Sequence, residues 1–271
     1  AVALLDEGVS LLAAGHDPYD PSKLGHLGYG SSPDVVTSAE LGAMAAAGRI
    51  ARPSDGMKPS SVVFVQCAGS RAPAHLSYCS SICCMTSLRQ AMQVRKLDPE
   101  ALATILYRDM RTPGLDERIL EEAQEDEGIF LARCDVTGVR PGKRGKLVVE
   151  ATGSSLGKDL AIETDLVVLA NGMVPSTLGR RVLGLSYRQG GECPEARHGF
   201  PDSEFVCFPY ETRRTGIYAA GTVRSPMTAA RCERDAIGAA LKAIQCLELT
   251  SAGAAVHPRS MDLSLPEFSL E

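Results

Sequence analysis

The feature that most constrains the fold is an alternation of short apolar strands with helical segments over residues 61–180. Continuous β-branched runs of this kind are typical of parallel strands that are buried on both faces. The predicted strands cover residues 62–66, 103–107, 129–133 and 166–170. The predicted intervening helices cover residues 80–95 and 115–125. This order predicts an α/β fold with a doubly wound, Rossmann-like domain.

Composition and charge exclude several classes of protein. The chain has 271 residues, of which 44% are hydrophobic and 23% are charged, and this balance is typical of globular proteins. The net charge is −5 and no basic stripe occurs, so we expect no nucleic-acid partner. No apolar run is long enough to span a membrane, and the first residues contain no secretion signal. We therefore expect a reducing, cytoplasmic location. Because residue 1 is Ala rather than Met and the last residues give no terminating structural signal, we also expect the chain to be a piece of a longer polypeptide.

Nine cysteines divide into a scattered group and a clustered group. The scattered group comprises Cys134, Cys193, Cys207, Cys232 and Cys246. The clustered group forms the motif Cys67-x11-Cys79-x3-Cys83-Cys84. Four thiolates suit an iron–sulfur cluster or zinc, but the adjacent pair does not fit the two spaced knuckles of a structural zinc site. One centre can reach both members of that pair only at the start of a helix, where the dipole favours an anion. Redox-active disulfides and cysteines that only fill space remain alternatives.

The turn after the first predicted strand lacks the glycines of a nucleotide site. A dinucleotide-binding unit needs G-x-G-x-x-G at this point, whereas this chain has Cys67-Ala-Gly69-Ser-Arg71. A single glycine followed by a bulky cation argues against NAD(P) binding. Two other charged residues, Asp109 and Arg111, follow the second strand, where they can face a cleft. His75, between the first two cysteines, is a candidate hydrogen-bond partner for a sulfur.

A second strand–turn–helix unit occurs near the C-terminal end. Residues 216–221 form an apolar strand that ends in glycine, and an alanine-rich helix is predicted over 229–247. Such a unit closes the FAD domain of flavoproteins with two dinucleotide domains, with the helix start directed at the flavin. Two other apolar segments also end in glycine, at Gly15 and Gly172. The candidate flavin-site residues are Gly15, Gly172, Gly221, Thr222, Pro226, Met227 and Thr228.

The cysteine motif resembles the signature of the heterodisulfide reductase A-subunit family. The resemblance lies in Val62–Arg71 and Tyr78–Met85. Supporting similarities occur, in the same order as in the family, at residues 14–21, 35–40, 166–175 and 216–221. Residues 255–268 are similar to a stretch of the B subunit of the quinone-interacting membrane-bound oxidoreductase complex.

The resemblance implies a thioredoxin-reductase-like FAD fold and an unusual [4Fe–4S] cluster on Cys67, Cys79, Cys83 and Cys84. It also implies electron relay between FAD, clusters and a redox partner, within a complex whose other subunits provide any membrane contact. The N-terminal FAD fingerprint is absent, so flavin binding is expected of the full-length protein. The alternatives are a pyridine nucleotide–disulfide oxidoreductase that uses the Cys83 and Cys84 thiols, and a docking scaffold without catalysis.

These expectations give a domain plan in which an FAD-binding domain is interrupted by the Rossmann-like domain. We expect part of the FAD domain at 1–15 and its return at 181–249. We expect a connector at 16–60, the Rossmann-like domain with the cysteine motif at 61–180, and a tail at 250–271.

Overall fold

The computed structural model describes residues 2–5, 9–153, 157–180, 197–203, 209–213 and 216–252. The chain divides into two compact units. Unit 1 comprises Ala1–Asp17 with Met173–Glu271, and unit 2 comprises Pro18–Gly172. Within the described part of the chain, every helix is too short or too polar to cross a membrane.

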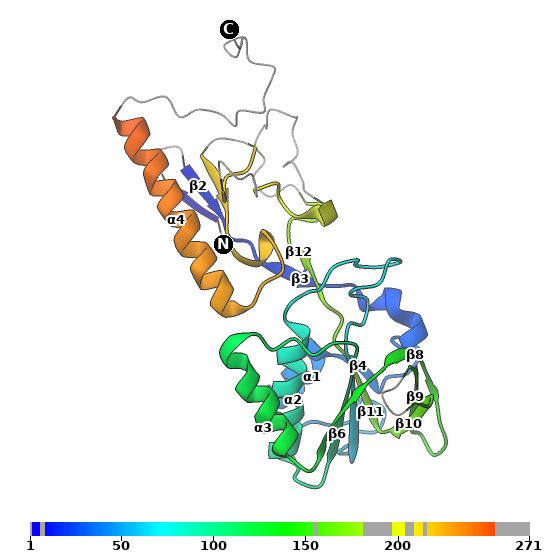
Figure 1. Ribbon diagram of the computed structural model, residues 1–271. Helices are drawn as coiled ribbons and strands as arrows, with labels where there is room; N and C mark the ends of the chain where they lie inside the picture. The colour runs from blue at the N-terminus through cyan, green and yellow to red at the C-terminus, as the bar shows by residue number, and fades with distance from the viewer. Residues whose placement is uncertain are drawn as a thin grey trace. The chain divides into compact units, whose positions relative to one another are not determined.

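Unit 2 is built on a five-stranded sheet in the order β4-β11-β5-β6-β7, in which all neighbouring strands run parallel (Figure 1). The strands are β4 (Val35–Thr37), β5 (Ser61–Val65), β6 (Leu102–Tyr107), β7 (Ile129–Arg133) and β11 (Leu166–Leu169). The prediction of a Rossmann-like α/β fold is confirmed. The strand order changes direction beside β5, and ligands of open α/β sheets bind at such a point, outside the carboxyl ends of the strands.

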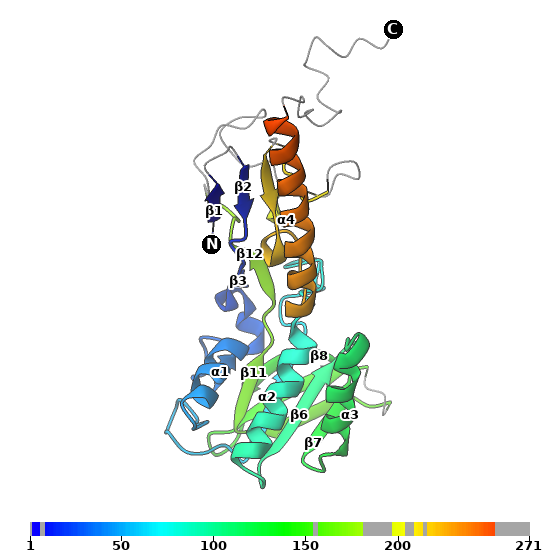
Figure 2. The same ribbon diagram turned by 90° about the vertical axis from the view of Figure 1, so that its left-hand side faces the viewer.

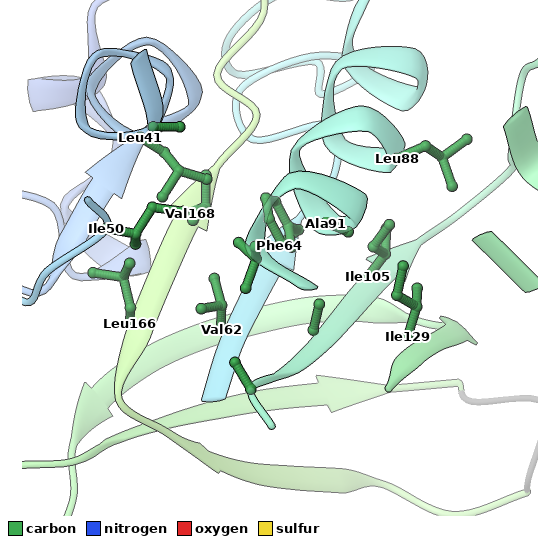
Figure 3. Packing of buried hydrophobic residues seen from close by; sticks show 14 of the residues in the cluster. Leu41, Ile50, Val62, Phe64, Leu88, Ala91, Ile105, Ile129, Leu166 and Val168 are labelled. Carbon is green, nitrogen blue, oxygen red and sulfur yellow. The ribbon is translucent and has the colours of Figure 1, made fainter. Parts of the chain in front are cut away.

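Three helices cover one face of this sheet (Figure 2). They are α1 (Ser38–Ala46), α2 (Cys83–Leu97) and α3 (Glu117–Glu125). Figure 3 shows Leu41 of α1 and Leu88 of α2 in the same hydrophobic cluster as the strand residues Phe64 and Val168. Helix α1 begins with a capping box, in which Thr37 accepts from the Glu40 N–H group and Glu40 accepts from the Thr37 N–H group.

A three-stranded antiparallel sheet lies against the other face. Its strands are β8 (Asp135–Pro141), β9 (Leu147–Thr152) and β10 (Leu160–Thr164). Strands β8 and β9 pair as an antiparallel hairpin. Strand β10 was not predicted, because its alternating exposure leaves only two apolar positions facing inward.

Residues 18–60, expected as part of a connector, instead belong to unit 2. They contribute the 3-10 helix η1 (Pro21–Leu27), strand β4 and helix α1. Strand β4 is only three residues long and pairs with β11, for instance through Val36 and Val168. A strand this short gains its burial from a partner more than a hundred residues away, so its local sequence carries little signal.

Unit 1 contains a three-stranded sheet, in the order β1-β2-β13, and the long helix α4. The strands are β1 (Val2–Leu5), β2 (Val9–Leu12) and β13 (Ile217–Ala219), and α4 spans Ala229–Ser251. Helix α4 packs on the sheet through Ala243 and Cys246, against Val9 and Tyr218. The strand and helix expected near the C-terminal end are therefore present.

Smaller elements complete unit 1, and some expectations fall outside the described residues. The short strands β3 (His16–Pro18) and β12 (Met173–Pro175) pair with each other. The 3-10 helices are η3 (Arg197–Gly199) and η4 (Gly221–Val223), and unit 2 has a further one, η2 (Gly114–Asp116). Cys193, Cys207, most of 181–214 and the tail from residue 253 onward lie outside the described residues.

Phe64 is the largest side chain in the centre of the sheet, and we predict that F64A destabilises unit 2. Its side chain is 0% exposed, so its truncation is expected to cost about 3–5 kcal/mol of unfolding free energy. Phe130 on β7 is 50% exposed, and F130A is expected to cost less than about 1 kcal/mol. Urea unfolding followed by circular dichroism measures both, and equal losses would contradict the packing described here.

Candidate functional site

The four cysteines of the clustered group line one pocket of unit 2. Cys67 lies two residues after the end of β5, and Cys83 and Cys84 are the first two residues of α2. Cys79 lies in the loop between these elements. The other lining residues are Ser70, Arg71, Ser80, Ser81, Asp109 and Arg111. The pocket lies where the strand order reverses, which is the binding position of an open α/β sheet.

Several residues of this loop have a left-handed backbone conformation, which residues other than glycine rarely adopt. Cys67, Arg71 and Ser81 have φ angles of 55°, 55° and 63°. Such residues cost free energy and persist where the surrounding structure fixes them, often at functional sites. Gly69 also has a positive φ, and a Cβ atom there would lie 2.8 Å from Tyr19 Cδ1. The loop is therefore held in one shape that sets the positions of the cysteines.

Each of the four sulfur atoms has an N–H donor. The Ser81 N–H group donates to Cys79 Sγ across 3.4 Å. The Gly172 N–H group donates to the Cys83 sulfur, and the Arg111 N–H group to the Cys84 sulfur.

The fourth donor is the Arg71 side chain, which hydrogen-bonds the Cys67 sulfur. Such bonds stabilise a sulfur that carries negative charge and tune the potential of iron–sulfur centres.

The start of α2 adds a positive potential to the same pocket. Its N-cap residue, Ile82, makes no side-chain capping bond, and the first turn contains no acidic residue. The first N–H groups of a helix have no partner within the helix and carry the positive end of its dipole. An anionic group bound by Cys83 and Cys84 at this helix start is therefore stabilised.

Burial opposes ionisation of the free thiols. Burial raises the pKa of Cys83 to about 12. Burial also raises the pKa of Cys67, against the opposing charge of Arg71, and that of Cys84, against the Arg111 N–H group. These thiols are consequently protonated near neutral pH, and a cationic centre that binds them has to displace the protons.

The charged residues expected to face a cleft do so, whereas His75 has a different partner. Asp109 and Arg111 line the cysteine pocket. Asp109 forms an ion pair with Arg71, with 2.6 Å between Oδ2 and Nη2. The Nδ1 atom of His75 lies 2.9 Å from the hydroxyl oxygen of Tyr19, so this ring is engaged with Tyr19 rather than with a sulfur.

Gly172, predicted as a flavin-site residue, lies in unit 2 beside the cysteines. Its φ is 75°, and a Cβ atom would lie 2.4 Å from Ser70 Oγ and 2.7 Å from Ser80 Oγ. These two hydroxyls hydrogen-bond each other across 2.8 Å and are buried. Glycine at this position lets the chain pass the serine pair and present its N–H group to Cys83.

The other predicted flavin-site residues lie in unit 1. Gly15 and Gly221 both have positive φ angles. The Thr222 hydroxyl oxygen lies 3.1 Å from His16 Nδ1, and burial lowers the pKa of His16. No local sequence pattern indicates the contact between His16 and Thr222, because 206 positions separate the two residues.

The turn before α4 is fixed by Asp235, which was not predicted from the sequence. This buried carboxylate accepts from the Gly221 N–H group at 2.8 Å and from Arg224 Nη2 at 2.6 Å. The turn continues through Pro226 and the buried Met227 to Thr228, which is the N-cap residue of α4.

The fold is similar to that of two solved thioredoxin reductases. The chain superimposes on the thioredoxin reductase of T. acidophilum with a TM-score of 0.52 and 17% identity, covering 93% of this chain and 72% of that one. For the thioredoxin reductase of Lactococcus lactis the TM-score is 0.53 at 17% identity, covering 88% and 65%. These similarities establish the thioredoxin-reductase-like fold.

Curated relatives are similar to this chain over most of its length, although no protein-family model matches it. The chain is 35% identical over 230 residues to the second iron–sulfur A subunit of the CoB–CoM heterodisulfide reductase of Methanopyrus kandleri, covering 81% of this chain and 34% of that protein. It is 33% identical over 250 residues to the A subunit of the H2:CoB–CoM heterodisulfide, ferredoxin reductase of Methanothermobacter marburgensis, covering 88% and 37%.

The expected resemblance to the heterodisulfide reductase A-subunit family is therefore confirmed, over 81% and 88% of this chain in the two relatives. The relative from Methanocaldococcus jannaschii, the iron–sulfur A subunit of its CoB–CoM heterodisulfide reductase, gives the same result, with 34% identity over 233 residues. The chain spans about a third of the length of the curated relatives that it matches.

We predict that G172A destabilises unit 2 more than G153A does. Both glycines have positive φ angles, so both variants incur the cost of a left-handed residue. A Cβ atom at Gly153 meets nothing within 4 Å, whereas at Gly172 it displaces the hydrogen-bonded serine pair. The additional loss in G172A is expected to be about 1–2 kcal/mol in urea unfolding. Equal losses would show that the serine pair yields freely.

We also predict that, in the reduced, metal-free chain, the alkylation rate of Cys83 rises at a higher pH than that of an ordinary thiol. The thiolate is the form that reacts, and burial raises the pKa of this thiol to about 12. The rate of its reaction with iodoacetamide is therefore expected to keep rising from about pH 9 to about pH 10.5, as the thiolate fraction grows. In the chain unfolded in urea, the rate is expected to level off, since an unperturbed thiol has a pKa of about 8.5. Peptide mass spectrometry measures both, and matching profiles would contradict the burial of this thiol.

Proposed function

We propose that the chain is the cluster-carrying part of an electron-transfer flavoprotein. Cys67, Cys79, Cys83 and Cys84 are the proposed ligands of one [4Fe–4S] cluster. When bound, such a cluster accepts and releases one electron at a potential set by its surroundings. The observation that carries the proposal is that each of the four sulfurs has an N–H donor within a single pocket.

The donor set supports a cluster over a single metal ion. Among the described residues, no three histidine, cysteine or carboxylate side chains converge closely enough to hold one ion. Four thiols spread around a pocket suit a larger centre, and zinc knuckles lack the adjacent Cys83-Cys84 pair.

The same features argue against the other interpretations of the cysteines. A packing role requires no N–H donors to the sulfurs and no left-handed residues around them. A dithiol enzyme requires a readily formed thiolate, whereas burial raises the pKa of Cys83 to about 12. An NAD(P)-dependent enzyme also needs a phosphate turn with the pattern G-x-G-x-x-G, and this turn has the single Gly69 followed by Arg71.

For the whole protein we propose FAD as the second redox group. The supporting residues in this chain are Gly15, Gly221 and Thr222, with Pro226, Met227 and Thr228 leading into α4. The buried Asp235 and the His16–Thr222 hydrogen bond hold this turn in a fixed shape. The relatives are named as A subunits of heterodisulfide reductases, so we propose other subunits of a redox complex as partners and oxidoreduction as the activity.

The test is anaerobic reconstitution with iron and sulfide. We expect about four irons per chain and a broad absorption band near ~400 nm, because four thiolates are available. The double variant C83S/C84S is expected to lose both signals. C134S is the matched control, since Cys134 is buried in unit 2 but does not line the pocket. Absence of iron from the wild type, or equal iron in the double variant, would overturn the proposal.

A further inference from the structure

Arg71 lines the cysteine pocket, and its backbone is fixed there by hydrogen bonds on both sides. Its backbone is fixed at a φ of 55°. The Arg71 N–H group donates to the Tyr78 carbonyl oxygen at 3.0 Å, and its own carbonyl oxygen accepts from Arg108 Nη1 at 3.1 Å. The loop thus directs one cation at the sulfurs.

The guanidinium group has three faces with different roles. One hydrogen-bonds the Cys67 sulfur, and Nη2 is paired with the Asp109 carboxylate at 2.6 Å. The Nη1 atom is buried and has no hydrogen-bond partner among the described residues. A buried donor of a charged group that lacks a partner is costly, and its presence indicates a missing acceptor.

The proposed function supplies that acceptor. A [4Fe–4S] centre with four thiolates is anionic, and its sulfur atoms accept hydrogen bonds. We propose that Arg71 is the positioning residue and counter-charge of the cysteine site, held by Asp109 so that its unpartnered N–H group serves the bound centre and raises its reduction potential. This inference rests on the proposed function.

Three other arginines lie in or near the pocket, and each can be compared with Arg71. Arg111 lines it, Arg133 Nη2 lies 3.9 Å from Asp109 Oδ1, and Arg108 pairs with Asp135 at 2.6 Å. The Arg133 side chain is 68% exposed, so its charge is screened by water and salt. Among these arginines, only Arg71 combines a bond to a sulfur with a buried donor that has no partner among the described residues.

The test separates a charge effect from a structural effect, because R71Q and D109N break the same ion pair but change the charge in opposite directions. The reduced centre carries more negative charge, so loss of the cation in R71Q lowers the potential and loss of the carboxylate in D109N raises it. We expect the reduced-to-oxidised ratio at a fixed potential to fall at least about tenfold in R71Q. For one electron, that corresponds to about 59 mV.

The measurement is a redox titration of the reconstituted chain, followed by its visible and electron paramagnetic resonance spectra. R71K, which keeps the charge, and R133Q, whose cation is screened, are expected to stay near the wild-type potential. Unchanged potential in R71Q, or a shift of R71Q and D109N in the same direction, overturns the role of Arg71 and leaves the cluster proposal intact.

Iron loading distinguishes the remaining outcomes. If the wild type binds no iron, the proposed function fails, and the role of Arg71 fails with it. If R71Q is the one variant that retains no iron, the reduction potential of D109N tests the role of Arg71. A D109N potential at or below that of the wild type overturns the inference.

Discussion

The central physical constraint is the set of N–H groups and positive charge that surrounds four sulfur atoms in one pocket, at the start of helix α2. Burial alone keeps the thiols protonated, as the raised pKa values of Cys67, Cys83 and Cys84 indicate. The N–H donors, the uncapped start of α2 and the Arg71 side chain act in the opposite direction. A pocket with this balance disfavours free thiolates and favours thiolates that share their charge with a metal centre.

The rest of unit 2 holds this pocket in place. Strand β5 is buried in the centre of the parallel sheet, and this burial fixes the position of Cys67, two residues after the strand ends at Val65. Helix α2 packs on the same sheet through residues such as Leu88 and Ala91, and this packing fixes where Cys83 and Cys84 begin the helix. A Rossmann-like scaffold directs a helix start at the end of its first strand, and here cysteines replace the phosphate-binding glycines at that point.

Features that depend on local pattern could be predicted from the sequence. The strands of the parallel sheet, helix α4 and the cysteine motif could be identified because their signals lie within a few residues of each other. The place of β4 in the sheet could not be predicted, nor could Asp235, His16 or the second role of Gly172. Each of these depends on a partner that only folding brings close, such as Val168 for β4 or the Ser70–Ser80 pair for Gly172. The connector expected at 16–60 differed from the structure for the same reason.

Native mass spectrometry of the anaerobically purified chain tests the central claim most directly, because it weighs whatever the four cysteines hold. We predict one species that is heavier than the chain by a single [4Fe–4S] cluster and is converted to the bare chain by C83S/C84S. A mass increase equal to one zinc ion, or a mass lowered by the hydrogens lost in disulfide bonds, would contradict it.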